Sequence, residues 1–229
     1  MRALRILLVV AVVLGGILVG LDRLAVTWAE SEVAGRTSLA GGRPDSVEVD
    51  IKGFPFLTQA ADKHFGEVEV VAKGVRTQAG GKPVRIGELT VDLRDVTVTG
   101  DWDGVRAGRA TGTAVISYAD LVAASDRGAT AMEYGGPGKV KVTGSVTVLG
   151  RTVTRTVVSS VTLVDGGTVK VRADEVPGEG LPLVEDMIRE RTDFERPLGR
   201  VAGMGVSKVE PRPEGLVVTV TGQDVAVAG

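Results

Sequence analysis

Cysteine is absent from this chain of 229 residues, and histidine occurs once, at position 64. The absence of cysteine excludes disulfide bonds, thiolate metal ligands, thiol catalysis and a lipid-modified N-terminal cysteine. A single histidine disfavours a histidine-based metal site or a catalytic triad, and we interpret His64 as a surface residue of a short helix. The G-x-S-x-G, P-loop and H-E-x-x-H motifs are also missing. We therefore predict a protein that is not an enzyme and that uses no metal or cofactor.

Basic clusters and aromatic residues are scarce as well. The formal net charge is −2, and Lys and Arg do not gather at any point. Because nucleic-acid binding needs a basic surface, we predict no nucleic-acid partner. Asp101 and Asp103 form a carboxylate pair, but their "GDWDG" context is typical of a hairpin turn rather than of a catalytic site. The composition thus excludes nucleic-acid binding and gives no support for catalysis.

The N-terminal segment has the pattern of an export signal or a membrane anchor. Two arginines precede the uninterrupted apolar residues 6–21, and Asp22 and Arg23 follow them. This order predicts that the N-terminus stays in the cytoplasm and that the rest of the chain lies outside. As a helix the run reaches about 24 Å, which is less than the ~30 Å hydrocarbon core but more than most signal-peptide cores span. Residues 27–29 offer only a weak cleavage site, so we favour an anchor in the cytoplasmic membrane over a cleaved signal within residues 1–22.

The remainder, residues 23–229, is dominated by apolar residues that recur with a period of two. Val47, Val49 and Ile51 share one face of a predicted strand, and the alternation in "GELTVDLRDVTVTG" slips at Asp95, which predicts a β-bulge. Similar segments follow to the C-terminus, separated by turn residues. Because no linker, charge block or fixed repeat divides the segment, we predict one α+β domain over residues 23–229 with a long, mostly antiparallel sheet.

Three segments favour helix instead of strand. Residues 23–42 are rich in Ala, Glu and Arg, residues 117–125 break the alternation, and residues 181–194 carry Pro182 near their start. We therefore predict two or three helices beside the sheet, after the N-terminal hydrophobic helix.

Three of the four phenylalanines lie in "GFPFLTQAADKHFG", residues 53–66, although aromatic residues make up only 3% of the chain. Gly53 allows a turn after the preceding strand, and Pro55 prevents helix at the residue before it. Residues 57–65 then form a short predicted helix that ends at Gly66. This strand–turn–helix corner is either a hydrophobic plug at one end of the sheet or the wall of an apolar cavity.

The segment "VEVDIKGFPFLTQAADKHFGEVEVVAKGV", residues 47–75, closely resembles the LmeA-like phospholipid-binding proteins of actinobacterial envelopes. The run at residues 53–59 is its most specific part. The resemblance extends to the preceding helix, to "ISYADL" at 116–121 and to "GLVVTVTGQDV" at 215–225. It implies a tubular lipid-binding (TULIP-like) fold, in which a long, highly curved antiparallel sheet wraps around a helix and encloses an apolar channel.

The same resemblance implies the ligand, the location and the residues involved. The expected ligand is a phospholipid, bound outside the membrane and close to its surface, in the service of envelope glycolipid assembly. Gln59 and Lys63 are the expected headgroup contacts. The residues expected to contact lipid chains are Phe54, Phe56, Leu57, Phe65, Ile116, Leu121, Leu183 and Met187.

Two other interpretations stay open from the sequence. A structural or adhesive β-rich envelope protein would have a filled core and no ligand. An envelope enzyme acting on glycolipid would need convergent carboxylates in the cavity, and the sequence shows none. The sequence identifies neither the lipid nor a protein partner.

Overall fold

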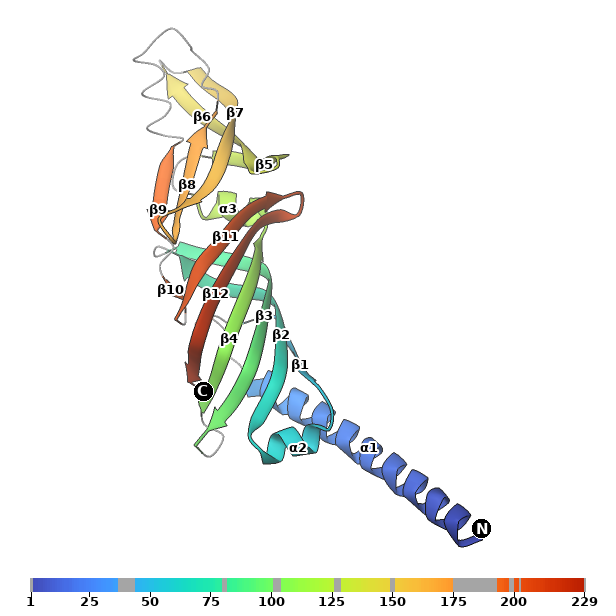
Figure 1. Ribbon diagram of the computed structural model, residues 1–229. Helices are drawn as coiled ribbons and strands as arrows, with labels where there is room; N and C mark the ends of the chain where they lie inside the picture. The colour runs from blue at the N-terminus through green and yellow to red at the C-terminus, as the bar shows by residue number, and fades with distance from the viewer. Residues whose placement is uncertain are drawn as a thin grey trace.

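The computed structural model describes residues 2–36, 44–79, 82–100, 104–125, 129–148, 151–174, 193–197, 200–201 and 203–228. Its elements are two antiparallel sheets and three helices, which lie along one elongated molecule (Figure 1). The helices are α1 (Arg2–Arg36), α2 (Phe56–Ala61) and α3 (Tyr118–Ala123). The predicted α+β class with mostly antiparallel strands is confirmed.

The larger sheet has seven strands in the order β1-β2-β3-β4-β12-β11-β10. Its strands are β1 (Ser46–Lys52), β2 (His64–Ala79), β3 (Lys82–Thr99), β4 (Gly104–Ile116), β10 (Arg200–Val201), β11 (Met204–Arg212) and β12 (Gly215–Ala228). The last three strands return from the far part of the chain and pair with β4 through β12. This sheet therefore joins the two ends of the chain into one unit.

The smaller sheet has five strands in the order β5-β6-β7-β8-β9. Its strands are β5 (Ala129–Gly136), β6 (Lys139–Val148), β7 (Arg151–Val164), β8 (Thr168–Ala173) and β9 (Phe194–Pro197). It lies beyond α3, at the end of the larger sheet opposite α1 (Figure 1). Valines of β6, β7 and β8 share one hydrophobic cluster with Val206 and Val209 of β11, so the two sheets are held together by a common core.

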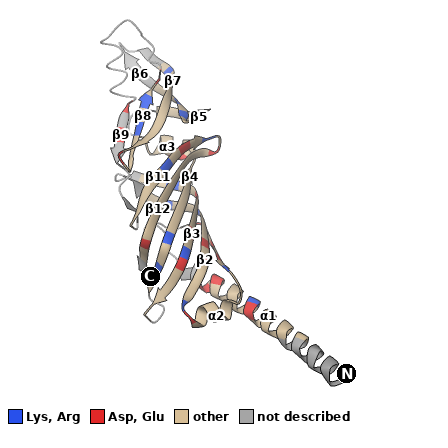
Figure 2. Ribbon diagram, in the orientation of Figure 1, with Lys and Arg blue, Asp and Glu red and all other residues tan. Residues whose placement is uncertain are grey.

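The strands of the larger sheet are polar on one face and apolar on the other. In β4, for example, Ala110, Gly112 and Ala114 alternate with Thr111 and Thr113. The antiparallel register places like residues side by side, so that each face continues from strand to strand. Charged residues occur on β2, β3 and β4 (Figure 2), and the register places Glu67, Glu69, Asp92 and Arg94 on the polar face. Such a sheet must cover its apolar face with other elements or with a ligand.

A transverse kink crosses four strands of this sheet at Gly66, Asp95, Gly108 and Asp224. Asp95 and Asp224 have positive φ values of 53° and 50°, a left-handed conformation that Asp tolerates better than most residues. Pairing resumes in the same register on both sides of the kink. The phase slip predicted at Asp95 is thus present, but it is not a bulge with one extra residue. All four strands slip together, so the apolar face stays continuous while the sheet bends.

The first helix differs from its predicted form. The predicted apolar helix and the predicted helix at residues 23–42 are one continuous helix, α1, because no helix-breaking residue separates them. Side chains of residues 2–11, 13 and 14 lie outside the described part of the structure, so the predicted anchor at 6–21 is described only in part. In the described part of the chain, no helix has both the length and the apolar character needed to cross a membrane.

Other predicted elements compare as follows. The short helix at residues 117–125 is confirmed as α3, capped by the Ser117 hydroxyl, which accepts a hydrogen bond from the Asp120 N–H. The helix predicted at 181–194 lies mostly outside the described residues, so the wrapping of the sheet around a helix stays a prediction. The interpretation of His64 as part of a short helix is wrong: α2 ends at Ala61, and His64 is the exposed first residue of β2.

Candidate functional site: the apolar face of the larger sheet

The middle of the apolar face is built by three neighbouring strands, β3, β4 and β12. Small residues lie on the central strand, and larger aliphatic residues lie on the strands that flank it. Gly112 pairs with Val91 on one side and with Val220 on the other. The members of this surface, called the central face below, are Leu89, Val91, Ala114, Gly112, Val218 and Val220.

The central face is only partly covered. Leu89, Val91, Ala114, Val218 and Val220 are all half-buried, whereas Phe65, Val96 and Ala107, at the end of the sheet near α2, are fully buried. Gly112 itself is buried, and a Cβ there would lie 2.8 Å from Val220 Cγ2, so the Val220 side chain packs across β4 at this point. Small residues on β4 between larger aliphatic neighbours give an apolar surface that is suited to contact with a flexible aliphatic chain.

One end of the apolar face is closed by α1 and α2, an arrangement called the α1–α2 corner below. Phe56 of α2 and Phe65 of β2 are 7% and 5% exposed, and their ring centroids lie 6.0 Å apart. They share a core with Val26 of α1 and with strand valines that include Val96. Two rings therefore plug this end of the sheet, as one of the two interpretations predicted, whereas Phe54 is 56% exposed. A role of this segment as the wall of an apolar cavity stays a prediction.

Polar contacts fix α1 to this corner. The carboxylate of Asp22 is buried, and its Oδ1 accepts a hydrogen bond of 2.8 Å from the Leu57 N–H at the start of α2. Two turns further along α1, Glu30 Oε1 accepts one of 2.9 Å from the Ile51 N–H, on the outer edge of β1. Asp22, Val26 and Glu30 are spaced by four residues and therefore lie on one side of the helix. This side of α1 packs against the edge strand and satisfies one of its backbone donors, the Ile51 N–H.

Gln59 connects the strands on either side of α2. Its Oε1 accepts a hydrogen bond from the Gly66 N–H, and its Nε2 donates to the Lys52 carbonyl. Gly53, at φ 102°, passes directly beneath this amide, and a Cβ there would lie 2.9 Å from Gln59 Nε2. The structure thus places the Gln59 amide within the corner, in contact with backbone groups.

Lys63, the second expected headgroup contact, lies beside the β3–β4 hairpin. It adopts a left-handed conformation at φ 52°, and its Nζ donates a 2.8 Å hydrogen bond to the Gly100 carbonyl. His64 Nδ1 lies 3.4 Å from Thr97 Oγ1. Headgroup contact by Gln59 and Lys63 stays a prediction, because their described partners are all protein atoms.

The opposite end of the apolar face is closed by the smaller sheet and by α3. Ile116, the last residue of β4, and Leu121 of α3 are both half-buried there. The Tyr118 hydroxyl donates a 2.7 Å hydrogen bond to the Arg212 carbonyl, which ties α3 to the end of β11. This end is therefore covered less completely than the corner, where Phe56 and Phe65 are buried.

The expected lipid-contacting residues fall into two groups rather than one site. Phe54, Phe56, Leu57 and Phe65 gather at the α1–α2 corner, and Ile116 and Leu121 lie at the other end of β4. The register places Phe65 level with Ala107, nine residues before Ile116 on β4, so at 3.3–3.4 Å per residue about 30 Å separates these groups. Leu183 and Met187 lie outside the described residues. The central face lies between the two groups. None of its residues was among the expected lipid contacts, although the alternation of Ala, Gly and Thr in "ATGTA" is the part of the sequence that forms its centre.

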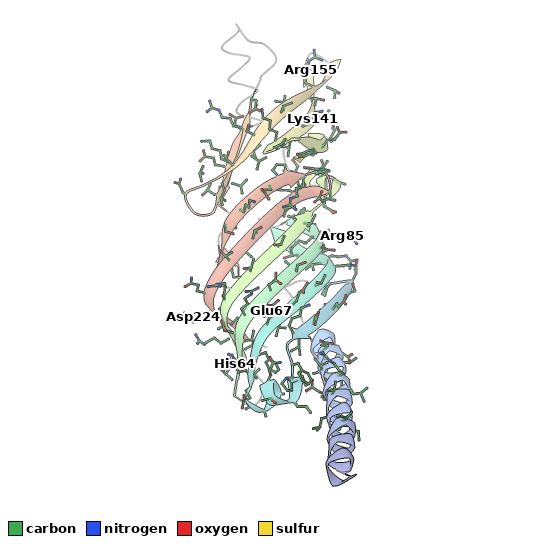
Figure 3. The ribbon with its side chains drawn as sticks, turned by 45° about the vertical axis from the view of Figure 1, so that its right-hand side comes forward. His64, Glu67, Arg85, Lys141, Arg155 and Asp224 are labelled. Carbon is green, nitrogen blue, oxygen red and sulfur yellow. The ribbon has the colours of Figure 1, made fainter. Side chains whose placement is uncertain are left out.

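The polar face carries a network of charges that excludes it as a site for an aliphatic chain. Glu67 pairs with Arg94 across β2 and β3, and Lys52 pairs with Asp50 and Glu69. Hydrogen bonds to Asp50 and then to Glu69 raise the pKa of Lys52 above its ordinary value. His64, Glu67 and Asp224 can be followed on the lower part of the larger sheet in Figure 3. The two faces therefore present opposite chemistry within one sheet.

The described residues provide little for catalysis. None of their His, Asp and Glu side chains form a group of three or more that could hold a metal ion. A shallow polar groove lies along β8 and β9, where Lys170 pairs with Glu195 at 2.5 Å and Arg172 with Asp193 at 4.0 Å. The groove is lined mainly by charged side chains, so it offers no apolar surface for a lipid chain.

Comparison with known proteins supports lipid binding. A family model described as LmeA-like phospholipid-binding matches residues 20–221 of the chain. The matched range begins two residues before Asp22, where α1 meets α2, and it ends within β12, the last strand of the larger sheet. Neither the curated proteins nor the solved structures include a match to the chain.

Proposed function

The chain belongs to the LmeA-like phospholipid-binding family, and from this membership we propose an extracytoplasmic phospholipid-binding protein. It carries or presents lipid during the assembly of cell-envelope glycolipids, and it binds without catalysis. The observation that carries this proposal is the central face, an apolar surface that lies between two closed ends and is itself only half covered.

The energetics of an acyl chain explain why such a surface is needed. Moving a chain from an apolar medium into water costs about 0.8 kcal/mol per CH₂, so a sixteen-carbon chain costs on the order of 12 kcal/mol. A carrier offsets this cost by offering a continuous apolar contact. Aliphatic side chains at Leu89, Val91, Val218 and Val220 supply that contact along the middle of the sheet.

The location follows from the N-terminal segment. Arginines precede the apolar residues 6–21, an order that favours export of everything beyond them. We place the domain outside the cytoplasmic membrane and tethered to it by this segment. The short distance between residue 21 and the first contact with α2, at Asp22, keeps the domain close to the membrane surface.

A structural role without a ligand is the alternative function. It predicts that the central face is covered by the protein itself and takes up no lipid. Native mass spectrometry with lipid extraction separates the two functions, using full-length protein purified in a detergent that preserves bound lipid. Phospholipid at about one molecule per chain is expected, and a folded chain that never carries or takes up phospholipid would contradict the proposal.

Neighbouring residues of β4 provide a matched pair of variants for this experiment. Ala114 lies on the central face and Thr113 on the polar face, and both are half-buried. We expect Ala114→Gln to reduce co-purified phospholipid several-fold, because it places a polar amide on the apolar central face. Thr113→Gln should retain wild-type lipid, and circular dichroism checks that both variants fold. Equal losses in the two variants would show that the central face does not hold the lipid.

A further inference from the structure

Exposed large apolar side chains are confined to one end of the described structure. All of them belong to α1 or to the α1–α2 corner, and the described parts of both sheets have none. They are Val12, Ile17, Leu18, Val19, Leu21, Leu24, Trp28, Phe54 and Leu57. A soluble surface scatters such residues singly, whereas a gathering of this kind marks an interaction site.

The arrangement around α1 identifies the kind of partner. At 100° per residue, the exposed residues from Val12 to Leu21 cover an arc of about 220° around the helix. A single helical partner or groove covers a stripe of roughly 100°. Hydrocarbon surrounds a helix on every side, so a lipid bilayer fits this pattern and a second protein helix does not.

Four of the exposed residues form a ring where α1 leaves the body of the protein, and we call them the collar: Leu21, Leu24, Phe54 and Leu57. Leu21 and Leu24 lie on the side of α1 turned away from Asp22 and Val26. On the other side, the Leu57 N–H contacts Asp22, and the Phe54 ring lies 5.8 Å below the Arg23 guanidinium carbon. The collar thus surrounds the helix at the level of residues 21–24, and no charged residue occurs in α1 between Val12 and Leu21.

Two polar groups at the collar have partners within the protein, although Asp22 Oδ2 is buried without a hydrogen bond. The Leu57 N–H, the free donor at the start of α2, bonds to Asp22, and Arg23 lies against the face of an aromatic ring. Backbone groups without partners are costly in an apolar layer, so these contacts suit the corner to partial immersion. Trp28 is four residues beyond Leu24, about 6 Å further along the axis, where an amphipathic ring meets lipid headgroups.

We propose that the collar is a membrane-docking surface, which sits at the boundary between hydrocarbon and headgroups and fixes the domain on the bilayer. This inference rests on the proposed function, because a phospholipid carrier must meet the membrane that supplies its lipid. It adds a contact made by the folded domain itself, through Phe54 and Leu57, to the tether formed by α1.

Tryptophan fluorescence in full-length protein tests the docking. The background variant carries Trp28→Phe and Trp102→Phe, and a single reporter is then introduced as Phe54→Trp. The protein is reconstituted into vesicles of phosphatidylcholine and phosphatidylglycerol whose acyl chains are brominated close to the headgroup. We expect this reporter to be quenched several-fold more strongly than a control reporter, Tyr134→Trp, in β5 at the end of the molecule opposite α1.

The outcomes separate the possible partners. Quenching by bromolipid supports the collar as a bilayer contact. Equal, weak quenching at both reporters, with free access of aqueous iodide to the Phe54→Trp reporter, would overturn it. Protection from both quenchers, accompanied by a dimer in sedimentation, would assign the surface to a second copy of the chain and would also overturn it. Phospholipid found by mass spectrometry in the same protein shows that the proposed function stands even if the collar fails.

A second set of variants guards against loss of folding. Leu24→Gln, Phe54→Gln and Leu57→Gln combined should shift the Trp28 emission of a Trp102→Phe protein towards that in water, because the domain no longer docks. The matched control combines Lys141→Gln and Arg155→Gln, two exposed cations of the smaller sheet (Figure 3), and should leave the emission unchanged. An unchanged emission in the collar variant would contradict the proposal.

Discussion

The α1–α2 corner and the central face are built from similar apolar residues but are covered very differently. At the corner, Phe56 and Phe65 are packed by α1, and hydrogen bonds from two backbone N–H groups end on α1 carboxylates. On the central face, residues such as Val91 and Val218 stay half-buried. The motif that is most distinctive in sequence therefore closes one end of the sheet, whereas a plainer stretch of Ala, Gly and Val is covered only in part.

The largest expected effect comes from emptying the corner. Phe65→Ala removes a ring that is 5% exposed and leaves a cavity beside Phe56, so the free energy of unfolding should fall by about 3–5 kcal/mol. Val91→Ala on the half-covered central face should cost about 1 kcal/mol, because its methyl groups are less buried. Urea unfolding followed by circular dichroism measures both values, and similar costs would show that the central face is as tightly packed as the corner.

A smaller effect is expected from the carboxylate that fixes α2 to α1. Asp22→Ala leaves the Leu57 N–H without its partner in a buried place, which should cost about 1–3 kcal/mol. Asp22→Asn keeps an oxygen acceptor and should recover part of the loss. Thermal unfolding of the two variants in the same detergent provides the comparison. If Ala and Asn destabilise the protein equally, the carboxylate contributes through its charge and not through this hydrogen bond.

Local patterns were sufficient to predict most strands and α3. The alternation around Val47, Val49 and Ile51 predicted β1, and the slip at Asp95 marked a true irregularity. Whether that irregularity is a bulge or a kink depends on the three neighbouring strands. Gly66, Gly108 and Asp224 lie opposite Asp95 only because the strands pair in this register. A single strand read by itself cannot distinguish a bulge from a kink shared by its neighbours.

Long-range contacts account for what the sequence did not predict about the site. Asp22 follows an apolar run, which by itself predicts the polar end of an anchor. Its carboxylate is nevertheless buried, and it accepts a hydrogen bond from Leu57, thirty-five residues later in α2. The residues of β4 on the central face are Ala and Gly, two residue types from which a binding site is hard to predict in a sequence. Their role depends on the larger neighbours Val91 and Val220, which belong to strands far apart in the chain.

The smallest expected effect lies on the polar face, behind the central face. Burial, followed by repulsion from Glu69 and Glu67, raises the pKa of Asp92 above its ordinary value. The native state therefore holds this proton more tightly than the unfolded chain does. Stability falls as the pH rises from the ordinary Asp value, about 4, through the raised native value.

Asp92→Asn removes this penalty and tests how the two faces differ. At pH 7 the variant should be more stable than wild type by less than about 1 kcal/mol, because the site is partly exposed and screened by solvent. Below pH 4 the carboxyl is protonated in both states, so the advantage should vanish. Urea unfolding at a series of pH values measures the difference in stability. The amount of bound phospholipid should not change, because Asp92 lies on the polar face, opposite the central face. A gain that persists at low pH would show that the acidic cluster does not set the stability of this face.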